Sequence, residues 1–313
     1  MSVDADVVHE HDGRSGATIE RVDGFVVKRA RAGQDITLVA TGGVNREAAL
    51  WEAGVLDRLP AGVGHPIVRI DRDGDATVTV MRDLGDAVVG WRRMARAEWG
   101  RIVDALAAVH ARFAGEALDA ACPLHDRVAA LSPVVQAPLV DGPNPLPAAV
   151  VEGWRRFAEL APAGVVEAVA AIHADPGPLV AALAASAPAT LLHADAWPVN
   201  VALEPDQVVL LDWAIATRGP GALDLAVLLT GIADHIDGTR EDVIDAYRQA
   251  AGDDLAPEAS IDLALLFGLA DMAWNKALDA TTHPDEAQRA RAAVDLAWWC
   301  ERAAPGLARL AAS

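Results

Sequence analysis

Three polar side chains that could share one reaction site follow one another in the second half of the chain. The segment LLHADAWPVN is followed by VALEPDQVVLLDW, in which EPDQ is typical of a turn between two short strands. If VAL pairs antiparallel with VVLLDW, Asn200 at the start of one strand lies beside Asp212 at the end of the other. Asp195 precedes Asn200 by five residues. We therefore expect an acid, an amide and a second acid to converge.

These residue types suit phosphoryl transfer. An amide oxygen and a carboxylate are hard oxygen ligands, which magnesium prefers when it also binds phosphates and water. Asn200 and Asp212 are thus candidate magnesium ligands, and Asp195 is left to accept a proton from a substrate hydroxyl.

The segment GFVVKRA contains an unusual lysine. Lys28 is one of only two lysines, the other being Lys276, so nearly all of the 26 lysines and arginines are arginine. The scarcity of lysine indicates that this strand position requires a property that arginine lacks.

The elements around Lys28 are predicted to be strands. TIERVDGFVVKRA places Asp23-Gly24 between two β-rich runs, and IVRIDRDGDATVTVM repeats this hairpin pattern at Asp73-Gly74. We expect the order strand, strand, strand, helix, strand, strand within residues 6–83.

The helix between the two hairpins has recognisable ends. In NREAALWEAGVLDRL, Asn45 is the expected N-cap, and good helix formers continue to Leu59, before Pro60 and Gly62.

The chain becomes helical after Trp91. RAEWGRIVDALAAVHARFAG has apolar residues at helical spacing, and further helices are expected near 148–160, 221–233, 257–279 and 285–303. The proline-rich residues 132–147 predict a loop, and the hairpin after Asn200 is the one strand-like island in this half.

Composition restricts the possible classes. With 313 residues, of which 52% are hydrophobic, the chain is long enough for two folded lobes. A formal charge of −19 disfavours a nucleic-acid binder and suits a cationic or metal-bound ligand. Cys122 and Cys300 lack metal-ligand spacing. Without a signal-peptide pattern or a long apolar run, we expect a cytoplasmic protein that does not enter the membrane.

The motif HADAWPVN followed by LLDW resembles the H-G-D-x-x-x-x-N and D-x-x motifs of the aminoglycoside phosphotransferase and choline-kinase-like family. The likeness extends to DGRSGA, VVKR, REAALW, VMRDLG, LAAVHA and ALDLA. It implies an α+β, two-lobed, protein-kinase-like fold. Residues 1–83 would form a nucleotide-binding lobe with a small antiparallel sheet and one helix, and residues 84–313 a mainly helical lobe with the catalytic loop and acceptor pocket.

The resemblance assigns nucleotide-binding roles. Lys28 would contact the α- and β-phosphates of ATP or GTP and pair with a helix glutamate, where a compact ammonium fits and the wide arginine fork does not. The family pattern selects Glu47. Glu52 is the alternative, about 140° away around the helix.

Other nucleotide contacts follow from position in the family pattern. Gly13 and Gly16 would cover the phosphates. Met81 would lie at the back of an adenine slot, and the Arg82 carbonyl and the Leu84 amide would face the base.

The resemblance also assigns roles to the residues of the catalytic loop, which differs from the family pattern at one position. Asp195 would be the base, His193 would order the loop through hydrogen bonds, and Mg²⁺ would bind Asn200 and Asp212. Ala194 replaces the usual glycine after the histidine, which matters if the loop needs a positive φ there. Asp224 would hold the loop through backbone hydrogen bonds, and His110 is expected to be a core residue.

The last helices of such kinases wall the acceptor pocket. Here the rings of Trp274, Trp298 and Trp299, together with carboxylates, could clamp a cationic or sugar-like acceptor. The carboxylates expected in this pocket are Asp234, Asp271 and Glu301.

The resulting prediction is a kinase, monomeric or homodimeric, for a small hydroxyl compound. The acceptor would be an antibiotic (aminoglycoside-like, peptide or nucleoside) or a sugar or amino-alcohol metabolite. Only eleven residues separate Asp212 from Asp224, too few for the activation segment of a protein kinase. The alternatives are a catalytically silent nucleotide-binding protein of the same fold and an acidic interaction scaffold.

Overall fold

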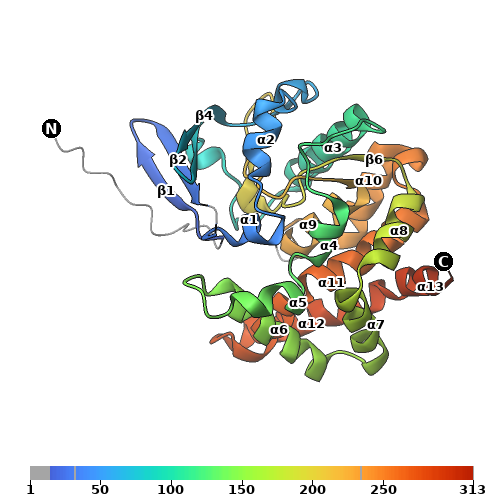
Figure 1. Ribbon diagram of the computed structural model, residues 1–313. Helices are drawn as coiled ribbons and strands as arrows, with labels where there is room; N and C mark the ends of the chain where they lie inside the picture. The colour runs from blue at the N-terminus through green and yellow to red at the C-terminus, as the bar shows by residue number, and fades with distance from the viewer. Residues whose placement is uncertain (1–14, 32, 233–234, 313) are drawn as a thin grey trace.

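The computed structural model describes residues 15–31, 33–232 and 235–312. An antiparallel sheet near the N-terminus is followed by a mostly helical part (Figure 1). The expected α+β class is confirmed. The boundary expected at residue 83 falls just after the last strand of the sheet, which ends at Arg82.

The N-terminal sheet has four strands in the order β1-β2-β5-β4, all antiparallel. They are β1 (Thr18–Val22), β2 (Phe25–Arg31), β5 (Ala76–Arg82) and β4 (Ile67–Asp73). Asp23 and Gly24 have φ of 51° and 80°, as a two-residue hairpin turn requires. The second turn lies one residue later than predicted, at Gly74-Asp75, because Asp73 still pairs with Ala76. The first expected strand lies outside the described residues.

Two short helices accompany this sheet. Helix α1 (Ile36–Ala40), which was not predicted, is capped by the buried Asp35, and α2 (Arg46–Glu52) is capped by Asn45 as expected. Helix α2 ends at Glu52 instead of Leu59. Gly54 has a φ of 65°, which interrupts the helix before a 3₁₀ turn at Leu56–Arg58.

Short strands support the expected catalytic segment. The predicted hairpin is present as β7 (Val201–Leu203) and β8 (Val208–Leu210), with Val201 opposite Leu210. Strand β3 (Val63–Gly64) pairs parallel with β8, and so joins an early segment of the chain to this hairpin. The sequence prediction missed β6 (Ala189–Leu192) and β9 (Thr217–Pro220), which pair antiparallel on either side of the hairpin in sequence.

The helical part is built around α11 (Glu258–Thr282), whose residues from 260 to 274 are all buried. Expected helices appear as α3 (Arg96–Phe113), α6 (Leu146–Leu160), α9 (Ala222–Ile232) and α12 (Glu286–Arg302). The predictions missed α4 (Leu124–Ala129), α7 (Ala163–Ala174), α8 (Gly177–Ser186), α10 (Arg240–Leu255) and α13 (Ala304–Ala312). The expected loop at 132–147 contains the short helix α5 (Pro133–Gln136).

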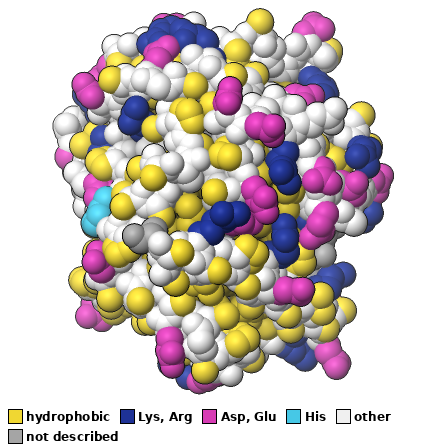
Figure 2. Space-filling model, turned by 90° about the vertical axis from the view of Figure 1, so that its right-hand side faces the viewer, with side chains coloured by type: hydrophobic (Ala, Val, Ile, Leu, Met, Phe, Trp, Pro, Cys, Tyr) yellow, Lys and Arg dark blue, Asp and Glu magenta, His cyan; other side chains and the backbone are white. Residues whose placement is uncertain are grey.

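One hydrophobic core joins the sheet to the helices. It includes Leu50 and Met81 from the N-terminal part, and Trp99, Trp213 and Trp299 from the rest. On the face shown in Figure 2, acidic and basic side chains are interspersed among apolar ones.

Within the described ranges, no single helix is long and apolar enough to cross a membrane. Helices α7 and α8 are long and apolar enough only when taken together, and the chain bends by 92° between them.

Candidate active site

The segment from His193 to Asn200 links β6 to β7 and forms the candidate catalytic loop. His193 is fully buried. Its backbone N–H donates to Asp224 Oδ2 (2.8 Å), its Nε2 contacts the Leu211 carbonyl (2.7 Å), and its Nδ1 accepts from the Asp195 amide (3.3 Å). These contacts require a neutral ring protonated on Nε2, and burial lowers the pKa of His193 accordingly. These contacts fit the loop-ordering role that the resemblance implies for His193.

Asp224, on α9, anchors the loop as expected. Its carboxylate accepts hydrogen bonds from the backbone N–H of His193 and of Ala194 (2.8 and 2.7 Å) and contacts Nε2 of His110 at 3.0 Å. Burial alone would raise the pKa of Asp224, but the His110 contact and the loop amides hold it below its usual value. His110 is a satisfied core residue, since its Nδ1 also contacts the Tyr247 hydroxyl at 2.8 Å.

Ala194 has a φ of 64°. The loop therefore needs the left-handed conformation that the family's glycine adopts freely, and here an alanine adopts it at a cost of about 1 kcal/mol.

Asp195 and Asn200 are in direct contact. Nδ2 of Asn200 donates to Oδ2 of Asp195 (2.8 Å) and to its backbone carbonyl (2.9 Å). Burial, followed by the charge of Asp212, raises the pKa of Asp195 to about 8, although Arg127 acts in the opposite direction. A carboxyl group with a pKa near neutral pH is suited to exchange a proton.

Lys28, on β2, points from the sheet into this region. Its Nζ lies 2.6 Å from Oδ1 of Asp212 and 4.0 Å from Oε1 of Glu47. Burial would lower the pKa of Lys28, but the two carboxylates more than offset it and hold the pKa above its ordinary value. The same lysine holds the pKa of Asp212 below its usual range, against the effect of burial.

Glu47, and not Glu52, faces Lys28. The Glu47 carboxylate is buried and accepts hydrogen bonds from the Thr79 hydroxyl (3.0 Å) and the Trp213 amide (3.2 Å). Burial is the main cause that raises its pKa. Glu52 is exposed and pairs with Arg72 at 2.8 Å.

Asn200 and Asp212 are neighbours at the open end of the β7–β8 hairpin. The Leu211 amide donates to the Asn200 carbonyl (2.8 Å), so the backbones of the two segments are in contact. Among the described residues, no cluster of three or more histidines, cysteines and acids could hold a metal. The candidate magnesium ligands, Asn200 and Asp212, are one amide and one carboxylate, a donor set that would suit an ion that keeps water and phosphate ligands.

Residues 11–261 match the model of the phosphotransferase enzyme family. The chain belongs to this family. The chain is thus a phosphotransferase, and the matched range contains Lys28, Glu47 and the whole candidate catalytic loop. A search of curated proteins found no match.

Solved structures of kinases share the fold of this phosphotransferase. Choline kinase LicA from Streptococcus pneumoniae has a TM-score of 0.55 at 14% identity, over 98% of this chain and 94% of that one. A microcompartment-associated aminopropanol kinase has a TM-score of 0.55 at 12% identity, over 91% and 86%. A mutant of aminoglycoside 2′-phosphotransferase-IIIa in complex with GDP has a TM-score of 0.50 at 14% identity, over 95% and 88%. At these identities the likeness establishes the protein-kinase-like fold.

The residues expected to contact adenine lie where the sheet meets the helical part. Met81 pairs with Val26 and Ile67 inside the sheet. The Arg82 side chain turns away and binds Glu204 (2.8 Å to Oε2). Leu84 is buried beside Ala202 and Val209. The Arg82 carbonyl and the Leu84 amide stay the candidate contacts to a base, and Met81 stays the residue expected behind it.

The predicted glycine loop is only partly described. Gly13 lies outside the described residues. Gly16 has a φ of 98°, and a Cβ atom added there would come within 2.6 Å of the Gln34 carbonyl oxygen. Gly16 is therefore required for close backbone packing beside α1.

The expected acceptor residues that the structure describes do not form an open pocket. Trp274 and Trp299 are buried in the helical core, 3% and 1% exposed. The Trp299 ring fills the space above Gly268, where an added Cβ would meet it at 2.7 Å. Glu301 is exposed on α12, and Asp234 lies outside the described residues. The prediction of this acceptor wall is wrong, because the tryptophan rings face the interior of the bundle.

Asp271 is also buried, but it is linked to the catalytic loop through Arg127, which donates to the Ala194 carbonyl. It forms a two-pronged ion pair with Arg127 on α4, at 2.6 and 2.8 Å. Arg127 was missed in the sequence, because nothing in CPLHDRVAAL distinguishes it from a surface arginine.

A different aromatic cluster adjoins Asp195. Trp197, two residues after it, meets Trp91 edge to face at a centroid distance of 5.6 Å, and Trp91 lies 5.5 Å from the His235 ring. Trp91 is 48% exposed. Trp197 lies within the loop motif and was the available sequence signal for this cluster.

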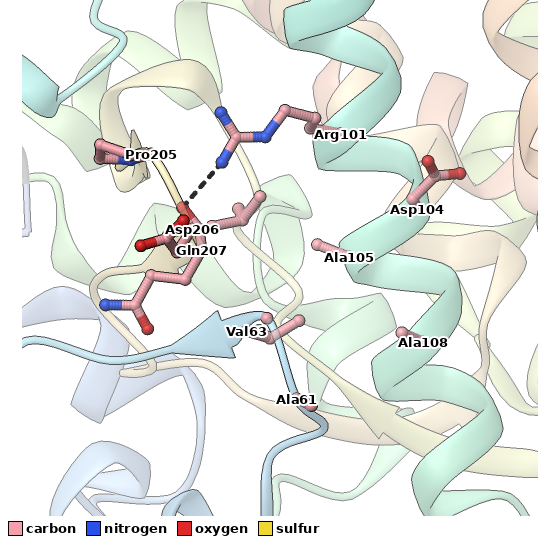
Figure 3. Close-up of a pocket in the computed structure, with 11 residues that line it drawn as sticks. Ala61, Val63, Arg101, Asp104, Ala105, Ala108, Pro205, Asp206 and Gln207 are labelled. Carbon is pink, nitrogen blue, oxygen red and sulfur yellow. Dashed lines mark hydrogen bonds between the residues drawn. The ribbon is translucent and has the colours of Figure 1, made fainter.

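A surface hollow of about 240 Å³ lies at the closed end of the hairpin, opposite the Asn200 end. Figure 3 shows Arg101 reaching from α3 toward the turn at Pro205–Gln207, where it donates to the Gln207 carbonyl (3.1 Å). The residues that line this hollow include none of the candidate catalytic residues, so we do not assign the hollow to the reaction.

Proposed function

We propose that this phosphotransferase transfers the γ-phosphoryl group of ATP or GTP to a hydroxyl group of a small molecule. One observation carries the proposal: Lys28, paired with Glu47 in the N-terminal part, contacts Asp212 in the helical part. Asp195 is hydrogen-bonded to Asn200, whose backbone contacts Leu211, the neighbour of Asp212. A cation for phosphates, a metal-binding carboxylate and a candidate base therefore share one location, as phosphoryl transfer requires.

Lys28 is the proposed phosphate ligand. In its described contacts, the ammonium is held by two carboxylates and remains charged. Nucleotide phosphates would compete with Asp212 for this ammonium, while Glu47, fixed by Thr79 and Trp213, keeps Lys28 oriented. The GDP complex of a structurally similar phosphotransferase supports a nucleotide ligand and leaves both ATP and GTP as candidate donors.

Asn200 and Asp212 fit a magnesium ion. Nδ2 of Asn200 is used by Asp195, which leaves its Oδ1 as a metal donor. Among the described contacts, Lys28 and the Ala214 amide both use Oδ1 of Asp212, which leaves Oδ2. Magnesium held there would neutralise negative charge on the phosphates during transfer.

Asp195 is the proposed base. It accepts the proton of the acceptor hydroxyl as the hydroxyl oxygen bonds to the γ-phosphorus. The bond from that phosphorus to the β–γ bridging oxygen breaks, and its electron pair leaves with the nucleoside diphosphate. The raised pKa of Asp195 favours this role, and Asn200 orients the carboxylate.

The acceptor is proposed to be a hydroxyl compound that also carries a basic or cationic nitrogen. Choline, aminopropanol and aminoglycosides, after which the three structurally similar kinases are named, share this chemistry. In this chain Trp91 pairs with Trp197, which follows Asp195 by two residues, and ring faces attract cations. Antibiotics and amino-alcohol or amino-sugar metabolites both belong to this class.

A coupled assay for nucleoside diphosphate release tests the function. ATP and GTP are each supplied with Mg²⁺ and with matched pairs of acceptors, such as an amino alcohol and the diol of the same length. Mass spectrometry then locates the added phosphate. We expect acceptor-dependent release that favours the amine of each pair. Nucleotide binding without release for any acceptor would contradict the proposal and favour a catalytically silent nucleotide-binding protein.

A further inference from the structure

The guanidinium of Arg127 reaches the catalytic loop from the helical core. Arg127 is only 3% exposed, and its Nη1 and Nη2 donate to the two carboxylate oxygens of Asp271 on α11, at 2.6 and 2.8 Å. Nη2 also donates to the backbone carbonyl of Ala194, at 3.2 Å. This carbonyl belongs to the peptide bond that joins Ala194 to Asp195.

Ala194 is thus held at both ends. Its N–H donates to Asp224 (2.7 Å) and its carbonyl accepts from Arg127. A non-glycine residue with a φ of 64° stays in that conformation only when its surroundings determine it. The two anchors come from α9 and α4, so separate parts of the helical core set the direction in which the chain enters Asp195.

The geometry of this ion pair suits positioning better than stabilisation. Buried ion pairs contribute little net stability, because desolvation offsets the attraction. Among the described residues, none accepts a hydrogen bond from the buried Nε of Arg127, which adds to that cost. The planar fork, which also lies 5.1 Å from the Phe267 ring centroid, contacts three acceptors in fixed directions.

We propose that Arg127, oriented by Asp271, is a positioning residue that fixes the Ala194–Asp195 peptide and thereby aims the Asp195 carboxylate. Arg127 acts through the loop and touches no reacting group. The proposal rests on the proposed role of Asp195 as base, and its test includes a measurement that needs no activity.

The first variant is Arg127→Met, and its matched control is Arg240→Met. Arg240 also pairs with a buried carboxylate, Asp295, and lies over an aromatic ring, Trp298, at 4.3 Å. We expect Arg127→Met to lower kcat by roughly 10- to 100-fold, as small misplacements of a catalytic group do, with the KM for nucleotide within about twofold. The control should change kcat by no more than about twofold.

A double variant, Arg127→Met with Asp271→Leu, removes both charges and keeps the proposal testable if the single variant does not fold. An apolar replacement of a buried ion pair is commonly tolerated. The double variant should fold and still show the loss of kcat.

Hydrogen exchange of the peptide that covers residues 191–198 provides the activity-independent measurement. We expect faster exchange in both Arg127 variants and unchanged exchange in Arg240→Met. The proposal would be overturned if the double variant showed wild-type exchange. It would also be overturned if Arg240→Met changed exchange and kcat as much as Arg127→Met does. If the wild-type protein phosphorylates no acceptor, the proposed function fails, while the exchange experiment still decides whether Arg127 fixes the loop.

Discussion

The ammonium of Lys28 lies 2.6 Å from the carboxylate of Asp212, although 184 residues separate them in sequence. The contact joins the N-terminal sheet to the segment that follows β8. It explains why this position holds one of only two lysines, since a compact ammonium can lie between Asp212 and Glu47.

Replacement of Lys28 should impair use of the nucleotide. Lys28→Met is expected to lower kcat/KM for nucleotide by roughly two to three orders of magnitude, because a charged donor to the phosphates is lost. Lys28→Arg should not restore it, since the planar fork cannot occupy the same space. Steady-state kinetics measure both. Lys276→Met, which loses an ion pair with Asp295, is the lysine control. Near-wild-type activity of Lys28→Arg would contradict this explanation.

Removal of the proposed base should slow the chemical step without weakening nucleotide binding. Asp195→Ala is expected to lower turnover by roughly two to four orders of magnitude while nucleotide still binds, because general-base catalysis is of that size. Single-turnover kinetics and calorimetric titration with nucleotide measure the two quantities. Asp206→Ala, an exposed acid at the closed end of the same hairpin, is the control. Turnover of Asp195→Ala near the wild-type value would exclude it as the base.

Replacement of either proposed magnesium ligand should raise the magnesium concentration that turnover requires. Asn200→Ala and Asp212→Ala are each expected to raise the magnesium concentration for half-maximal turnover by roughly tenfold or more, since each removes one hard oxygen donor. A magnesium titration at saturating nucleotide measures this. If both variants keep the wild-type magnesium requirement, the metal does not bind at the hairpin end.

Loss of an aromatic ring from the Trp91–Trp197 cluster should weaken binding of the acceptor and leave binding of the nucleotide unchanged. Trp91→Ala is expected to raise the KM for the acceptor by roughly three- to tenfold, the size of one aromatic contact, and to leave the KM for nucleotide unchanged. Trp298→Ala, a half-buried tryptophan on α12, is the matched control. Equal effects of Trp91→Ala on both substrates would place Trp91 elsewhere in the mechanism.

Three histidines, two of them buried and one half-buried, should each make a contribution to stability that mild acid removes. Burial lowers the pKa of His65, His173 and His193 in the folded protein. Below about pH 6.5 these histidines bind protons in the unfolded chain, whereas in the folded protein their rings stay neutral to lower pH. At these histidines the unfolded state then holds more protons, so their contribution to the free energy of unfolding falls as the pH drops from about 7 to 5. The raised pKa of Asp195 acts in the opposite direction, because the folded protein holds that proton.

Denaturant unfolding at several pH values measures this effect. His173→Gln can keep a donor to the Ala270 carbonyl, which the ring contacts at 2.8 Å, and should remove the share of the fall that His173 contributes. An identical slope in this variant would show that His173 does not contribute.

Local interactions account for what could be predicted from the sequence. The Asp23-Gly24 turn, the Asn45 cap and the β7–β8 hairpin each depend on residues a few positions apart, so spacing alone indicates them. The same locality placed Asn200 beside Asp212.

The tertiary structure alone decided which distant side chains meet. Helix α11 is buried on all sides along most of its length, so its sequence has no polar face to indicate which neighbour each residue contacts. Trp274 therefore lies in the core, and Asp271 meets Arg127 under the catalytic loop. The positive φ of Ala194 likewise results from anchors on α4 and α9, because contacts between segments far apart in the chain leave no periodic pattern in it.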